Sequence, residues 1–132
     1  MPINQQNALG LLQKMLGPET HFRPGQFEAI ESVINKGGKQ LIVQKTGWGK
    51  SIIYFIITKI LRDSGKGPTL LISPLLSLMR NQILNASNIG IKAESINSSN
   101  FSSSILISYI RPNSYTLILI SGSYTSFKLA II

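Results

Sequence analysis

Cysteine is absent from this chain of 132 residues, and acidic residues, histidine and tryptophan are scarce. Without cysteine, the protein has neither a disulfide framework nor a cysteine-ligated metal site. No apolar run approaches the roughly 18 residues that are needed to span a membrane. The polar residues 1–6 show no signal-peptide pattern. We therefore expect a cytoplasmic protein without a membrane partner.

The shortage of acidic residues makes the chain strongly basic. It has 13 Lys+Arg against 5 Asp+Glu, which gives a formal net charge of +8. A basic excess favours a polyanionic partner such as nucleic acid, although a basic surface that only faces solvent would give the same composition. Hydrophobic residues make up 43% of the chain. This fraction indicates a folded core, and the length suits one domain.

The most informative segment is residues 44–51, Gln-Lys-Thr-Gly-Trp-Gly-Lys-Ser. An apolar run precedes it and predicts a buried strand at residues 41–44, and the apolar residues 52–57 that follow predict a buried helix. A strand, a glycine-rich loop and a helix form the context that a phosphate-binding loop requires. Glycines let the backbone N–H groups face an anion, and the helix presents its positive N-terminal end to that anion.

Two residues carry most of the chemistry of such a loop. Lys50 would reach the outer phosphates, and the Ser51 hydroxyl would bind Mg²⁺. The strict motif has glycine at position 44, where this chain has Gln44, but the shorter form Thr-Gly-x-Gly-Lys-Ser is present at residues 46–51. The alternative is a glycine-rich turn between a strand and a helix that contains a lysine by chance.

Apolar spacing along the rest of the chain predicts alternating helices and strands. This alternation indicates an α/β fold with a parallel sheet that is flanked by helices. We expect an N-terminal helix within residues 1–20 and a main domain at 21–132, of which 97–132 is a divergent tail without acidic residues. The expected helices are 4–16, 24–36, 50–63 and 74–90, and the expected strands are 41–44, 69–73, 92–96 and 116–121.

Three sequence blocks occur in a characteristic order. They are Phe-Arg-Pro-Gly-Gln-Phe-Glu-Ala-Ile at 22–30, the loop at 44–51, and Leu-Ile-Ser-Pro-Leu-Leu-Ser-Leu-Met-Arg-Asn-Gln-Ile at 71–83. Together they resemble RecQ-like ATP-dependent DNA helicases of superfamily 2, of the DEAD/DEAH-box type. The resemblance covers roughly residues 22–100. It implies the N-terminal part of the first motor domain of such an enzyme, a partial RecA-like P-loop domain.

The resemblance also implies a nucleotide site. Gln26 would read the adenine edge, because its amide has both a donor and an acceptor, and Arg23 would flank the base. Taken alone, Gln26 is better explained as a glutamine at a helix start that faces water, and the alternative for Arg23 is a surface charge. Trp48 would either pack beside the nucleotide or be exposed. The residues that would hold ATP are Arg23, Gln26, Thr46, Gly47, Trp48, Gly49, Lys50 and Ser51, with Lys50 as the catalytic residue and Ser51 on Mg²⁺.

The third block implies a nucleic-acid contact. Ser73, Pro74 and Leu75 would start a helix that lies against single-stranded DNA or a duplex during unwinding. A serine hydroxyl at a helix N-terminus can hold a backbone phosphate without reading sequence, and Arg80 would add a second phosphate contact. The alternative for this block is a well-capped core helix.

Other parts of the family pattern are missing from the sequence. Related helicases have an Asp-Glu-x-His box whose carboxylates hold Mg²⁺ through water, whereas Asp63 is the only aspartate here. We therefore expect an N-terminal helicase fragment that binds ATP and DNA, with a complementing helicase fragment as a candidate partner. The alternatives are a small P-loop nucleotide-binding protein, such as a nucleotide kinase, and a non-functional gene remnant.

Overall fold

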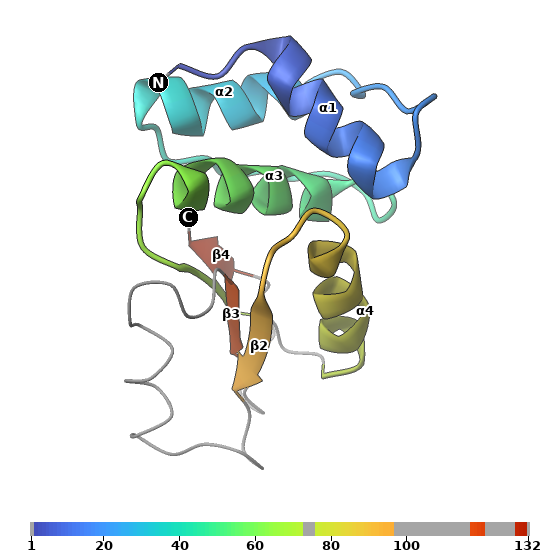
Figure 1. Ribbon diagram of the computed structural model, residues 1–132, viewed down its shortest axis with the longest axis vertical. Coiled ribbons are helices and arrows are strands. Elements are labelled where there is room, and N and C mark those ends of the chain that lie inside the picture. The colour runs from blue at the N-terminus through green and yellow to red at the C-terminus, as the bar shows by residue number, and fades with distance from the viewer. Residues whose placement is uncertain (1, 73–75, 97–116, 121–128, 132) are drawn as a thin grey trace.

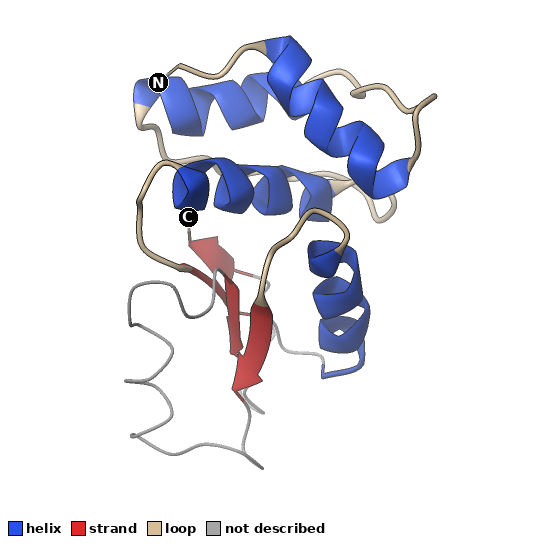
Figure 2. Cartoon of the chain, in the orientation of Figure 1, coloured by secondary structure: helices blue, strands red, loops and turns tan. Residues whose placement is uncertain are grey.

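The computed structural model describes residues 2–72, 76–96, 117–120 and 129–131. Helices α1 and α2 form an outer layer, α3 lies beneath them, and the sheet lies on the other side of α3 with α4 beside it (Figures 1 and 2). The predicted α/β class is therefore found. The elements are α1 (Gln5–Leu16), α2 (Gln26–Lys36), α3 (Lys50–Asp63), β1 (Thr69–Ile72), α4 (Leu76–Ser87), β2 (Ala93–Ile96), β3 (Leu117–Ile120) and β4 (Leu129–Ile131).

The first helices begin and end close to the positions that the sequence predicts. The Asn4 side chain caps α1 by accepting a hydrogen bond of 2.8 Å from the Asn7 N–H. Helix α2 ends at Gly37, which has a left-handed backbone. It begins two residues later than expected, because Gly25 at φ 87° forms its N-cap. In the described part of the chain, no helix is long and apolar enough to cross a membrane.

Within the residues that the structure describes, the sheet has four strands in the order β2-β3-β1-β4. Strand β3 pairs in parallel with both β1 and β2, so that Leu117 lies opposite Thr69 on one side and Ala93 on the other. The expected parallel strands 69–73, 92–96 and 116–121 are thereby confirmed, with shorter bounds. Strand β4 was not expected, and it pairs antiparallel with the remaining edge of β1. The sheet is therefore mixed rather than wholly parallel.

The strand expected at residues 41–44 is not formed, and that prediction is wrong. The segment lies outside the sheet. Leu41 is 88% exposed and Val43 79% exposed, while Ile42 alone packs against the helical core. Strand β1 has β3 on one side and β4 on the other, so no free edge of β1 is left for this segment. Apolar side chains suit a strand, but a ladder also needs a neighbouring strand.

Two cores meet at α3. The first lies between α1, α2 and α3 and contains Leu12, Ile30 and Ile56, each almost fully buried. The second joins Phe55 of α3 to Leu71 of β1 and to residues in and after α4. Because α3 is packed on both sides, its apolar run 52–57 forms the buried helix that the sequence predicts. Burial also raises the pKa of Tyr54, which packs against the second core.

Candidate functional site

The loop before α3 has the curled backbone that a phosphate loop needs. Gly47 has φ 85°, and Gly49 has φ 101° and forms the N-cap of α3. The Trp48 N–H donates to the Lys45 carbonyl at 3.3 Å and closes a turn within the loop. Lys50 is the first residue of α3, and Ser51 follows in the first turn. The loop-and-helix part of the predicted arrangement is thus present, although the strand before it is not.

The Lys50 ammonium folds back over the loop. Its Nζ donates to the Gln44 carbonyl at 2.5 Å and to the Lys45 carbonyl at 3.0 Å. Both partners are neutral, and a charged phosphate oxygen forms a stronger hydrogen bond with an ammonium group than a carbonyl does. A polyphosphate in the loop would therefore compete well for Lys50.

The turn before α2 lies against the other side of the loop. Arg23 Nη1 donates to the Gly47 carbonyl at 2.6 Å, and Gln26 Nε2 donates to the Trp48 carbonyl at 2.9 Å. Gln26 is 2% exposed, and its Oε1 accepts a hydrogen bond of 2.9 Å from the Arg23 N–H. The structure thus brings the first two sequence blocks together. In this arrangement the two side chains hold the loop backbone.

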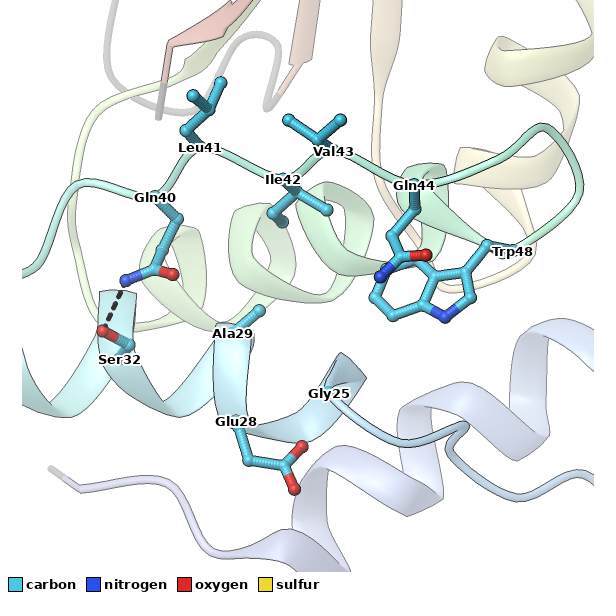
Figure 3. A pocket seen from close by; sticks show the side chains of 10 residues that line it. All are labelled: Gly25, Glu28, Ala29, Ser32, Gln40, Leu41, Ile42, Val43, Gln44 and Trp48. Carbon is cyan, nitrogen blue, oxygen red and sulfur yellow. Dashed lines mark hydrogen bonds between the residues drawn. The ribbon is translucent and has the colours of Figure 1, made fainter.

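Trp48 is partly buried and packs against the helical core. A Cβ atom added to Gly25 would lie 3.6 Å from its ring carbon Cζ2, which shows how closely the indole approaches the start of α2. Trp48 also lines a hollow of about 450 Å³ between α2 and the segment 40–44 (Figure 3). Of the two alternatives for this residue, full exposure is excluded.

The remaining predicted residues are spread over the molecule. Thr46 is exposed in the loop, and Arg80 is exposed on α4. Ser73, Pro74 and Leu75 lie outside the described residues. A serine hydroxyl in the first turn of α3, next to Lys50, fits one Mg²⁺ ligand of a phosphate loop. Within the described ranges, there is no cluster of three or more His, Asp or Glu side chains that could hold a metal by themselves.

Sequence reasoning missed the way in which the loop is held. The carbonyls of Gln44, Lys45, Gly47 and Trp48 all accept hydrogen bonds from side chains of Arg23, Gln26 or Lys50. The family resemblance implied that the first two blocks share one nucleotide site. It did not show that the contact is between side chains and loop carbonyls, because the direction of a carbonyl depends on the folded backbone.

Comparisons with known proteins show what this chain is similar to. A model of the DEAD/DEAH box helicase family matches residues 23–119. The chain is 40% identical over 97 residues to ATP-dependent DNA helicase RecQ of Haemophilus influenzae, which covers 74% of this chain and 15% of that protein. It is 41% identical over 91 residues to RecQ of Bacillus subtilis, covering 69% and 15%. Against the ATP-dependent helicase SGS1 of Saccharomyces cerevisiae, it is 36% identical over 77 residues, covering 58% and 5%. The chain therefore spans 15% or less of the length of these relatives.

Proposed function

This chain belongs to the DEAD/DEAH box helicase family and is RecQ-like, and from that premise we propose that it binds Mg·ATP at the loop 44–51 as part of a RecA-like domain. The observation that carries the proposal is the loop itself. Two glycines with positive φ lead into α3, and Lys50 and Ser51 stand at the N-terminus of that helix. The family match favours a helicase part over a small P-loop nucleotide-binding protein of another kind.

In the proposed site, neighbouring groups would bind different parts of Mg·ATP. Backbone N–H groups of Gly47, Gly49 and the first turn of α3 would cradle the phosphates. The Lys50 ammonium would leave the loop carbonyls and bind the outer phosphates, while the Ser51 hydroxyl would bind Mg²⁺. Thr46 and Trp48 complete the loop, and Arg23 and Gln26 support it from the turn before α2. Mg·ATP would supply the phosphoryl group and the metal charge.

Calorimetric titration with Mg·ATP tests this site. We expect weak, saturable binding by the wild-type chain and a loss of about tenfold or more in affinity for Lys50→Ala, since an ammonium that bonds to phosphate is worth roughly 1.5–3 kcal/mol. Lys45→Ala is the matched control, because it removes the same charge from an exposed position of the same loop. Equal affinity in the wild type and Lys50→Ala would show that this loop is not the site.

We further propose that the chain binds DNA without sequence preference. The support is the net charge of +8 and the similarity to proteins named DNA helicases. Ser73, Pro74 and Leu75 would lie against one DNA strand, with the Ser73 hydroxyl on a backbone phosphate, and Arg80 on α4 would contact a second phosphate. Arg80→Ala should weaken binding to single-stranded DNA and lower its salt dependence, while Lys14→Ala on α1 should not. Binding that is the same at low and high salt would contradict this proposal.

We also propose that this chain alone does not turn over ATP at a helicase-like rate. Phosphoryl transfer needs a metal, a water and a positive charge placed around the γ-phosphate. The only aspartate, Asp63, pairs with Lys59 at 3.2 Å at the opposite end of α3 from the loop. A complementing helicase fragment would have to supply the missing carboxylates. An ATPase assay with single-stranded DNA decides, and turnover near one per second that Lys50→Ala abolishes would overturn the proposal.

A further inference from the structure

We propose that the C-terminal ends of α2 and α3 together form a second DNA-binding surface, separate from the contacts proposed for residues 73–75 and Arg80. This surface, called the basic end below, consists of Lys36, Lys39, Arg62 and Lys66. It would hold backbone phosphates without reading sequence. The inference rests on the proposed DNA binding for the chemistry of the partner, whereas the place of the surface follows from how the two helices pack.

Helices α2 and α3 run side by side in the same direction, so their C-terminal ends lie at the same side of the molecule, on the left in Figure 1. The two helices are parallel because the chain between them, residues 37–49, returns along their length. Close to these ends, Val33 and Ile34 of α2 and Ile60 and Leu61 of α3 belong to one core. Packed helices have axes about 8–10 Å apart, so the two helix ends are neighbours.

The basic end concentrates positive charge that is not neutralised within the chain. In each helix, one cation lies in the last turn and another lies three residues beyond the helix end. Asp63 is the only acidic residue in the segments 36–39 and 62–66, and it already pairs with Lys59 at 3.2 Å. Among the side chains that the structure describes, no carboxylate forms an ion pair with any of the four cations. A polyanion would therefore meet four uncompensated charges.

Helix stability alone does not account for this charge. A cation in the last turn of a helix stabilises it through the helix dipole, which is an ordinary role for Lys36 and Arg62. The effect is confined to the last turn. Lys39 and Lys66 lie beyond the helix ends and are exposed, so they contribute charge to the surface without this structural role.

Hydrogen bonds hold the turn after each helix in place. The Gly38 N–H donates to the Ser32 carbonyl at 3.0 Å, and the Lys66 N–H donates to the Leu61 carbonyl at 3.0 Å. Arg62 Nη1 also donates to the Lys66 carbonyl at 2.8 Å. The cations of the basic end are thus carried by ordered backbone, and less conformational freedom is lost when a partner binds.

The extent of the basic end suits a DNA backbone. Cations from two helix ends about 8–10 Å apart are spread too widely to enclose one small anion. Duplex DNA carries one negative charge for about every 1.7 Å of its length, so it can contact all of them. Helix α3 has 14 residues and is therefore about 21 Å long, which separates the basic end from the phosphate loop. DNA bound there would leave the loop accessible to Mg·ATP.

Cross-linking from a single introduced cysteine tests the place of the DNA, because the chain has no cysteine of its own. Gly67 follows Lys66, and a Cβ atom added to Gly67 would meet no described atom within 4 Å. Gly10 on α1 is the matched control, because it offers the same open space and neither glycine has a positive φ. After labelling with benzophenone maleimide, Gly67→Cys should cross-link to single-stranded DNA and Gly10→Cys should not. Equal yields from the two variants, or no yield from Gly67→Cys, would overturn the inference.

Removal of charge tests the contribution of the basic end to affinity. Lys39→Gln/Lys66→Gln removes one cation beyond each helix end and leaves the last turns unchanged. The loss of two phosphate contacts should lower the salt slope for single-stranded DNA by about 1.4 and the affinity by about tenfold or more. Lys14→Gln/Lys45→Gln removes the same charge from exposed positions elsewhere and should keep the wild-type slope. Wild-type slope and affinity in Lys39→Gln/Lys66→Gln would overturn the inference.

Arg80→Ala, measured beside these variants, separates this inference from the proposed function. If only Arg80→Ala weakens DNA binding, the contact on α4 stands and the basic end fails. If only Lys39→Gln/Lys66→Gln weakens it, the basic end stands and the contact on α4 fails. A wild-type chain that bound no DNA would overturn both. If Lys39→Gln/Lys66→Gln lost binding to phosphatidylserine vesicles but kept wild-type DNA affinity, the surface would be one for lipids and the inference would be overturned.

Discussion

Two apolar segments of similar composition lie in different structural environments in this molecule. Leu41-Ile42-Val43 precedes the phosphate loop and lies outside the sheet, whereas Leu70-Leu71-Ile72 belongs to β1. Leu41 and Val43 are among the most exposed apolar side chains of the described chain, while Leu71 is 5% exposed. Residue type alone therefore does not decide between the two environments.

The two segments differ in whether neighbouring strands pair with them. Strand β1 has β3 on one side and β4 on the other, so its backbone groups pair on both edges. Within the described ranges, no strand pairs with residues 41–43. Their one inward side chain, Ile42, packs on the helices. A strand forms where a ladder is available, and hydrophobicity then decides which face is buried.

The largest expected effect contrasts the two leucines. Leu71→Ala should lower the free energy of unfolding by about 2–4 kcal/mol, because it leaves a cavity between α3, β1 and α4. Leu41→Ala should change it by less than about 0.5 kcal/mol, because that side chain is exposed. Urea unfolding followed by circular dichroism measures both. Comparable losses in the two variants would mean that residues 41–43 are buried in solution.

A pH titration probes the contact between α3 and the second core. Burial raises the pKa of Tyr54 above its ordinary value near 10. As the pH rises past 10, the unfolded chain releases this proton before the folded chain does, so the free energy of unfolding falls. Below pH 10, the stability that the buried, protonated Tyr54 contributes is fully present. Between pH 8 and pH 10.5, the free energy of unfolding should fall less in Tyr54→Phe than in the wild type. Identical falls in the two proteins would contradict the burial of Tyr54.

The smallest expected effect concerns the link between α3 and the start of β1. Thr58 is buried, and its hydroxyl donates to the Thr69 hydroxyl at 2.9 Å. Thr58→Val keeps the shape and should cost about 1 kcal/mol of stability through the lost hydrogen bond. A double-mutant cycle with Thr69→Val measures the coupling. Fully additive losses would show that the two hydroxyls do not interact in solution.

Much of the fold was predictable because its signals are local. Asn4 and Gly17 bound α1, Gly37 ends α2, and the apolar run after Lys50 makes α3. The strands at 69–72, 93–96 and 117–120 were recognised as apolar runs between turns. The antiparallel strand β4 and the exposure of residues 41–43 were not predicted. Both depend on which strands are neighbours in space, and no local pattern contains that information.

The backbone geometry of the candidate site was predictable in part for the same reason. Glycine spacing and the Lys50-Ser51 pair identified the loop, because those residues are consecutive. The contacts of Arg23 and Gln26 with the loop join residues more than twenty positions apart and involve backbone carbonyls. Their identity as polar residues was visible in the sequence, but their partners were not.

The proposal that the loop binds the nucleotide is tested most directly by mapping the bound phosphates onto the backbone. Titration of the ¹⁵N-labelled chain with Mg·ATP, followed by amide chemical shifts, would locate the ligand residue by residue. We predict that the largest shift changes fall on residues 45–51, including Gly47 and Gly49, and that Lys50→Ala reduces them while Lys45→Ala does not. Saturable changes on another face of the molecule, with the amides of 45–51 unmoved, would contradict it.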